Sequence, residues 1–124
     1  MSRAFLWFNA AVIGAIGLAY LYGPNLLLGQ YDLSVQDVGL DNMMRATYGG
    51  VFVAVAVIFG IGAAHPPRQR DALMLATLFM GGLALGRVAS MISVGLPPSG
   101  LLPLLGYEAI AAGLALVLGR RAAV

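Results

Sequence analysis

The sequence contains no cysteine and only one histidine. Without cysteine the chain can form no disulfide, no thiolate metal site and no thiol-based catalytic centre. The single histidine, His65, lies in a predicted turn before two prolines, where an imidazole is far more often solvated than metal-bound. Axial ligation of haem by two histidines is excluded, and no carboxylate cluster is present to bind a hard metal. We therefore expect neither a metal nor a cofactor.

Charged residues are scarce as well, at 10% of the 124 residues, whereas 60% are hydrophobic. A soluble domain carries charge on about a quarter of its residues, so this composition excludes a soluble globular protein. The basic residues, all of them arginine, are scattered over loops, the chain end and two hydrophobic segments. Residues that bind a nucleic-acid backbone form a concentrated stripe instead, so the net charge of +2 indicates no nucleic-acid partner.

Long apolar segments account for most of the chain. A membrane-spanning helix needs about 20 mostly apolar residues, because each residue advances about 1.5 Å across a core of about 30 Å. Gly23 and Pro24 lie near the end of the first segment, where a helix kinks or stops, and proline-containing turns follow the second and third. The spans are predicted at about 5–28, 43–64, 71–94 and 101–119. We predict one domain, 1–124, with an all-α fold: an integral membrane four-helix bundle.

The beginnings of the first two spans carry further signals. The first segment follows Arg3 and so resembles a signal peptide, but it is long and no small-residue cleavage site follows it, which favours an uncleaved span. In the polar connection before the second span, Ser34 and Asp37 have the spacing of a capping box. This spacing predicts a short interfacial helix, and Asp41 or Asn42 would then cap the second span.

The distribution of charge predicts the orientation of the chain. With four spans, the side opposite the termini holds three aspartates, Asp32, Asp37 and Asp41, and neither of its connections contains a basic residue. Arginine-rich loops remain in the cytoplasm during insertion, so we expect both termini to be cytoplasmic. The arginines that lie on the side of the termini are Arg3, Arg68, Arg70, Arg120 and Arg121.

Small residues on the third predicted span form a stripe. Gly82, Gly86 and Ser90 follow one another at intervals of four residues and therefore share one helix face. Lipid tails are as apolar as leucine, so helices in a membrane associate through close backbone approach at such residues. The stripe predicts a helix-packing surface, either within the bundle or toward another copy or another protein.

The spans also contain three ionisable residues near the side opposite the termini: Arg45, Arg87 and Glu108. A charge near the bilayer centre costs about 2.5–3.5 kcal/mol on insertion scales, so such residues are usually paired and turned inward. Arg87 and Glu108 each lie about seven residues from the end of their span, about 10 Å deep, which makes them natural partners. Tyr48 lies one turn beyond Arg45, and Ser90 one turn beyond Arg87. Together these five residues predict an outward-facing polar pocket.

This cluster has two interpretations, one structural and one functional. The Arg87–Glu108 pair is either a salt bridge that fixes the register of two helices or part of a binding site. In a binding site, two arginines against one glutamate leave one excess positive charge, which favours an anionic headgroup. Asp41 would weaken this argument by neutralising the surplus. Arg45 by itself lies close enough to the interface to extend toward lipid phosphate.

No nucleophile and base with the logic of a catalytic triad can be identified in the spans. Ser90 and Ser93, which lie near the end of the third span, have no histidine partner within the membrane. We therefore assign no catalytic residue, and the sequence favours a protein that is not an enzyme.

Three short motifs coincide with these positions: Arg45-Ala46-Thr47-Tyr48-Gly49-Gly50, Gly86-Arg87-Val88-Ala89-Ser90 and Tyr107-Glu108. With these motifs and its opening stretch from Arg3 to Ala10, the chain resembles a family of small bacterial four-span proteins classed as a domain of unknown function. The likeness covers nearly the whole chain, and the layout is also loosely similar to that of DoxX-like membrane proteins. This resemblance implies a four-helix fold and residence in the bacterial inner membrane, and it supplies no activity.

The first functional hypothesis is a non-enzymatic accessory or interaction subunit of a membrane complex, because the loops are short and no catalytic machinery is found. The alternative is binding of a lipid or anionic amphiphile in the pocket lined by Arg45, Tyr48, Arg87 and Glu108. A membrane enzyme or a small oligomeric transporter is a third possibility. The expected partners are membrane lipids and either another membrane protein or a second copy of this chain.

Overall fold

The computed structural model describes residues 1–122, which contain helices, turns and connections but no β-strand. Four helical segments are long and apolar enough to cross a membrane, as predicted. The second of them is continuous but contains a stretch of seven residues with the wider π-helical winding between two α-helical parts. The segments are α1 (Ser2–Tyr22), α3 with the π-helical stretch and α4 (Val38–Met44, Arg45–Val51 and Phe52–Ala64), α5 (Gln69–Val94) and α6 (Leu102–Ala122).

The first helix is shorter than the predicted span. It ends at Tyr22, six residues before the expected bound of 28, because Gly23 adopts an extended conformation with φ −179° and ψ 124°. A separate short helix, α2 (Pro24–Leu28), then begins with proline at its first position, where the missing N–H is not needed. The chain therefore breaks the helix at the Gly-Pro pair rather than bending it.

The second spanning segment begins earlier than predicted. Asp37 caps α3 through its Oδ1, which accepts a hydrogen bond of 2.9 Å from the backbone N–H of Leu40. The helix then continues without interruption into the membrane-spanning part, so no separate interfacial helix follows Asp37. The expected cap at Asp41 or Asn42 is therefore wrong, because both residues lie inside the helix.

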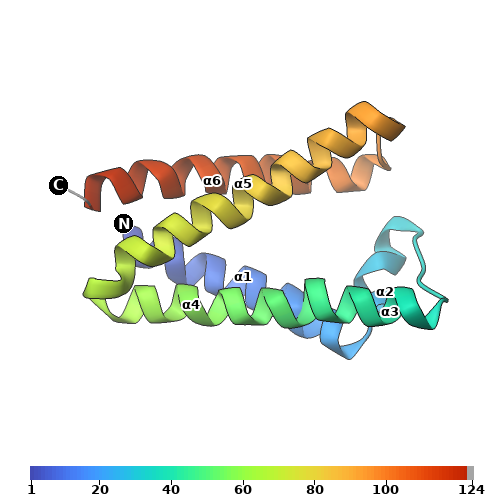
Figure 1. Ribbon diagram of the computed structural model, residues 1–124, viewed down its shortest axis with the longest axis horizontal. Helices are drawn as coiled ribbons and strands as arrows, with labels where there is room; N and C mark the ends of the chain where they lie inside the picture. The colour runs from blue at the N-terminus through green and yellow to red at the C-terminus, as the bar shows by residue number, and fades with distance from the viewer. Residues whose placement is uncertain (123–124) are drawn as a thin grey trace.

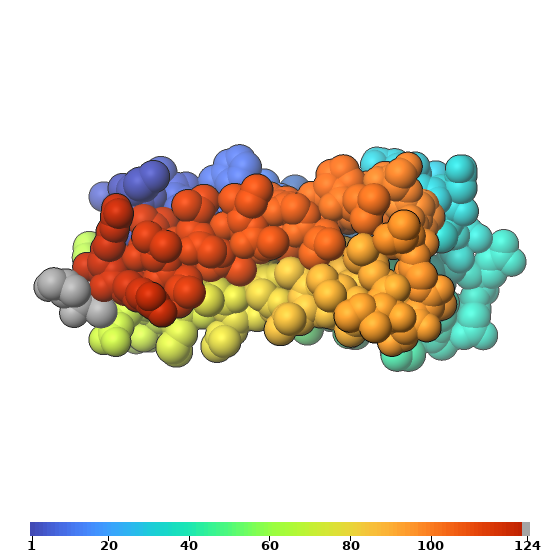
Figure 2. Space-filling model, turned by 90° about the horizontal axis from the view of Figure 1, so that it is seen from above, coloured from blue at the N-terminus to red at the C-terminus, as the bar shows by residue number. Residues whose placement is uncertain are grey.

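The connections gather at two opposite ends of the molecule (Figure 1). The terminal end holds both chain termini and the turn 65–68, and the loop end holds the connections 23–37 and 95–101. α1 runs beside α4, whereas α5 starts next to α4 at the terminal end and diverges from it toward the loop end (Figure 1). Figure 2 shows α5 and α6 side by side along one face.

The most deeply buried apolar side chains lie toward the terminal end. Leu6 of α1, Phe59 of α4 and Leu73 of α5 are fully buried in one cluster that also includes Ala115 of α6. Arg3 closes this end, since its Nε donates a 3.0 Å hydrogen bond to the carbonyl oxygen of Ala63 at the end of α4. The solid core therefore occupies the half of the bundle where α4 and α5 are still close together.

Glycine allows close helix contact at places other than those predicted. A Cβ on Gly17 of α1 would lie 2.8 Å from Val53 Cγ2 and 3.0 Å from the carbonyl oxygen of Gly49. By contrast, a Cβ on Gly82 or Gly86 would meet no atom within 4 Å. Among the described residues 1–122, no neighbouring helix covers the predicted stripe on α5, so its packing against another copy or another protein stays a prediction.

Candidate functional site

Arg87 of α5 and Glu108 of α6 form a bidentate ion pair. Arg87 Nε lies 2.7 Å from Glu108 Oε2, and the second nitrogen, Nη2, lies 2.8 Å from Oε1. The Glu108 side chain is 6% exposed and that of Arg87 is 27% exposed. The two charges that the sequence places at equal depth therefore meet, and both oxygens of the buried carboxylate are satisfied.

The ion pair leaves part of the guanidinium available. Arginine has five N–H donors in a planar arrangement, and the contacts with Glu108 use two of them. Three donors remain, two on Nη1 and one on Nη2. Arg87 lines two adjoining cavities. Arg87 can thus donate hydrogen bonds to a further group while its charge stays neutralised by Glu108.

The first cavity, which we call the inner cavity, lies between the helices at the loop end and has a volume of about 300 Å³. All four long helical segments contribute to its wall, and Leu27, Leu28, Tyr31 and Leu33 line it from the connection after α1. Most of the lining side chains are apolar. The polar exceptions are the Arg87–Glu108 pair and four tyrosines: Tyr20, Tyr31, Tyr48 and Tyr107.

Tyr48 belongs to the π-helical stretch and to a row of aromatic rings. Its ring centroid lies 5.2 Å from that of Tyr20 and 5.3 Å from that of Phe52, which in turn contacts Phe79 at 5.1 Å. These separations suit favourable tilted and edge-to-face contacts between aromatic rings. π-Helical turns are rare and occur often at functional sites, and this one holds the tyrosine that lines both cavities.

Of the four tyrosines of the inner cavity, only Tyr48 belonged to the predicted cluster; Tyr107 was named only in the motif with Glu108, and Tyr20 and Tyr31 were not identified. The position of Tyr20 could have been found from helical periodicity, because it follows Asn9, Ile13 and Gly17 on the buried face of α1. Tyr31 lies in a connection, and nothing in its sequence neighbourhood indicates that the connection folds back over the cavity.

Arg45 does not join this site, contrary to the predicted cluster. Its Nε donates a 2.7 Å hydrogen bond to Asp41 Oδ2, and its Nη1 contacts the backbone oxygens of Leu21 and Tyr22 at 2.7 and 3.1 Å. Because α1 ends at Tyr22, its last carbonyls have no partner within the helix, and a cation there is favourable. The expected surplus of positive charge in the pocket is therefore missing.

A second polar contact joins α1 to α6 one residue away from Glu108. The hydroxyl of Tyr107 donates a hydrogen bond to the side-chain oxygen of Asn9, which is 1% exposed. The Asn9 nitrogen in turn donates to the carbonyl oxygen of Phe5 at 2.8 Å. Both ends of the buried amide are satisfied, so this contact is part of the scaffold that positions α6.

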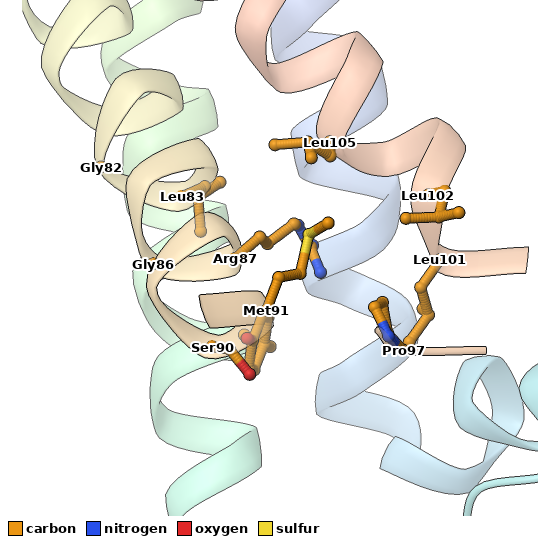
Figure 3. Close-up of a pocket in the computed structure, with 11 residues that line it drawn as sticks. Gly82, Leu83, Gly86, Arg87, Ser90, Met91, Pro97, Leu101, Leu102 and Leu105 are labelled. Atoms are coloured by element: carbon orange, nitrogen blue, oxygen red, sulfur yellow. The ribbon is translucent and has the colours of Figure 1, made fainter. Parts of the chain in front are cut away.

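The second cavity, which we call the lateral groove, has a volume of about 450 Å³ and lies between α5 and the beginning of α6. In Figure 3, Arg87 extends from α5 across the groove, toward the side on which Leu102 and Leu105 of α6 lie. Ser90 lines this groove and not the inner cavity. The residues shared by the two cavities are Tyr48, Leu83, Arg87 and Leu101.

The fold and its cavities define a class: a multi-pass membrane protein whose four apolar helices enclose an ion pair at one end. Residues 1–119 match the model of a family described as a domain of unknown function, DUF4345, and the chain belongs to this family. No curated protein and no solved structure matches the chain.

Proposed function

We propose that this protein binds a membrane amphiphile whose polar head carries no net charge, with that head in the inner cavity beside Arg87 and Glu108. The observation that carries the proposal is the ion pair on the wall of a largely apolar cavity of about 300 Å³. Cavities of about 300–1,000 Å³ with apolar walls and a few convergent polar groups are typical of small-molecule sites.

The charge balance of the cavity determines the net charge that the ligand's polar head can carry. Arg87 and Glu108 neutralise one another, and Arg45 is engaged by Asp41 and by the end of α1. An anionic head would therefore bring an unpaired charge into a medium of low dielectric constant, at considerable cost. A zwitterionic head or an uncharged carbonyl would instead accept hydrogen bonds from the free N–H groups of Arg87 without adding charge.

Native mass spectrometry of the protein extracted gently from its own membrane tests this proposal. We expect an additional mass that corresponds to one net-neutral amphiphile. The variant to compare replaces the ion pair by apolar residues of similar size, Arg87→Met with Glu108→Leu, because such replacements often leave stability unchanged or improve it. This double variant should fold and should lack the additional mass.

The matched control is Arg45→Ala, which removes the arginine of the predicted cluster that lines neither cavity. It should retain the bound mass. A wild-type chain without additional mass, or a folded double variant that keeps it, contradicts the proposed function.

A second candidate is an interaction subunit of a membrane complex, favoured by the uncovered stripe of Gly82, Gly86 and Ser90 on α5. Small residues of this kind allow a partner helix to approach closely. In the same mass spectra this role predicts a second polypeptide. Its release by Gly82→Leu would identify α5 as the contact, and its retention would exclude the stripe as the interface.

We also propose that both termini lie in the cytoplasm of a bacterium, with the loop end facing outward from the inner membrane. The arginines of the terminal end and the aspartates near the loop end, Asp32, Asp37 and Asp41, support this orientation through the positive-inside rule. Because the chain has no native cysteine, single cysteines at Ser2 and Ser99 can be labelled without background. A membrane-impermeant maleimide added to intact spheroplasts should label position 99 and not position 2.

A further inference from the structure

The lateral groove lies at the depth of lipid tails. Its α5 wall runs from Gly82 to Met91, and the helix ends at Val94. At 1.5 Å per residue, Ser90 lies about 6 Å and Gly82 about 18 Å from the loop end of α5. Gly82, Gly86 and Ser90 are all exposed, so the groove opens sideways toward lipid.

The groove and the inner cavity meet at Arg87. Besides Arg87, the described residues that line both spaces are Tyr48, Leu83 and Leu101. Figure 3 shows the Arg87 side chain projecting into the groove. A molecule that follows the groove toward the loop end therefore reaches the free guanidinium donors without passing through the aqueous surface.

We infer that the ligand reaches the inner cavity from the bilayer through the lateral groove, and that its apolar tail remains in the groove over Gly82 and Gly86. This inference rests on the proposed function and specifies its ligand: a bilayer-resident amphiphile with an oxygen-bearing head of no net charge and a long tail. The absence of side chains at the two glycines provides the width that the tail occupies.

The polar end of the groove favours an amphiphile over a partner helix as its occupant. A transmembrane helix satisfies its backbone groups internally, so it has no free carbonyl at this depth to accept from Arg87. The phosphoryl or carbonyl oxygen of an amphiphile can accept one hydrogen of Arg87 Nη1 together with the remaining hydrogen of Nη2. The groove thus combines a surface for a tail with donors for a head.

The test uses the full chain in vesicles of phosphatidylglycerol, whose anionic head should not compete. Two photoactivatable probes are compared, each with a diazirine in its tail: a phosphatidylethanolamine and a quinone with a long apolar tail. After irradiation, peptide mass spectrometry should locate cross-links of at least one probe on residues 82–91 of α5. Which probe reacts distinguishes a phospholipid from a quinone as the source of the head.

The decisive variant is Gly86→Leu, which fills the groove and whose Cβ meets open space, so the fold should persist. Cross-linking to α5 should fall about tenfold, equivalent to about 1.4 kcal/mol of binding free energy. The matched control is Gly113→Leu, because Gly113 is also exposed and open but lines neither cavity. This control should leave the cross-linking unchanged.

The outcomes separate this inference from the proposed function. If Gly86→Leu retains both cross-linking and the bound mass while the ion-pair double variant loses the mass, the ligand uses another path and only the inference is wrong. If neither probe labels α5 above the level of the ion-pair double variant, the inference is wrong as well. A second polypeptide in the native mass spectra that Gly82→Leu releases would assign the groove to a partner helix and overturn the inference.

Discussion

Glycine has opposite roles on the two sides of the bundle, the side of α1 and the side of α5. Where α1 crosses the π-helical stretch, Gly17 and Gly49 let the backbones approach so closely that even a methyl group would collide with Val53 or Leu21. On α5, Gly82 and Gly86 are surrounded by open space. Glycine therefore allows close contact between α1 and the π-helical stretch, whereas on α5 it leaves the lateral groove unfilled.

This contrast separates the parts of the molecule that hold it together from those that can admit a ligand. On the α1 side, stability comes from close contact, in which dispersion forces act between well-matched surfaces. Where α5 and α6 line the cavities, an ion pair joins the two helices instead. The predictions below alter one side or the other, in order of decreasing effect.

The largest effect on stability is expected from Glu108→Ala. It leaves the Arg87 charge without its partner about 10 Å below the loop end, and breaking a buried pair costs about 3–5 kcal/mol. Because Arg87 is 27% exposed, we expect the lower value, about 3 kcal/mol, in unfolding from detergent micelles. The double replacement Arg87→Met with Glu108→Leu should recover most of this loss. Unchanged stability in Glu108→Ala would show that the pair does not hold α5 to α6.

The second-largest loss of stability is expected at the close contact between α1 and the second spanning segment. Gly17→Ala places a methyl group 2.9 Å from the backbone nitrogen of Val53, which cannot move without displacing the helix. Overpacking of this kind costs about 1–3 kcal/mol, measured by the same unfolding experiment. Adding Val53→Ala should restore only part of the stability, because the backbone atoms remain in place. Full recovery would mean that side chains, not backbones, set the distance between α1 and the π-helical stretch.

A smaller loss is expected from Arg45→Ala, which removes the contacts of this side chain with Asp41 and with the end of α1. A cation at a helix C-terminus contributes about 0.3–1 kcal/mol and an i,i+4 pair about 0.3–0.5 kcal/mol, so the total should be about 1 kcal/mol. Ligand binding should not change, in contrast to the variants at Arg87. A loss of bound ligand without a loss of stability would show that Arg45 takes part in ligand binding.

The smallest effect, with the opposite sign, is expected from Gly113→Ala. Its Cβ meets nothing within 4 Å, so the gain in helix propensity is not offset by a collision. Alanine is favoured over glycine in a helix by about 0.8–1 kcal/mol, and the thermal midpoint should rise slightly. Gly82→Ala should behave in the same way. A destabilised Gly113→Ala variant would show that another molecule covers this face in the membrane.

Several features of the fold follow from local sequence. The spans are recognisable from apolar length alone, and the break after α1 coincides with the Gly23-Pro24 pair. The partnership of Arg87 with Glu108 is predictable as well, because equal depth on consecutive antiparallel helices leaves few alternatives. The cap of α3 at Asp37 was not predicted, because the capping-box spacing made Ser34 the cap and Asp37 its partner. Capping residues occur in succession along that connection, and local sequence does not rank them.

The position of Arg45 was not predictable from the sequence. Its partners on α1 lie 23 and 24 residues away, and they are available only because α1 ends at Tyr22. The same applies to the stripe on α5. Small residues permit close approach whether or not a helix is present. Whether a helix packs against the stripe depends on the angle at which α5 leaves α4 (Figure 1).

The sequence by itself determines a membrane protein of four helices with a buried pair of opposite charges, because hydrophobic length and the cost of an isolated charge are local properties. Only the tertiary structure decides that Arg87 of this pair lines two adjoining cavities, that Arg45 lies outside them, and that Gly82 and Gly86 of α5 face open space. These features depend on helix crossing angles, which arise from the sum of many weak contacts between residues far apart in the chain.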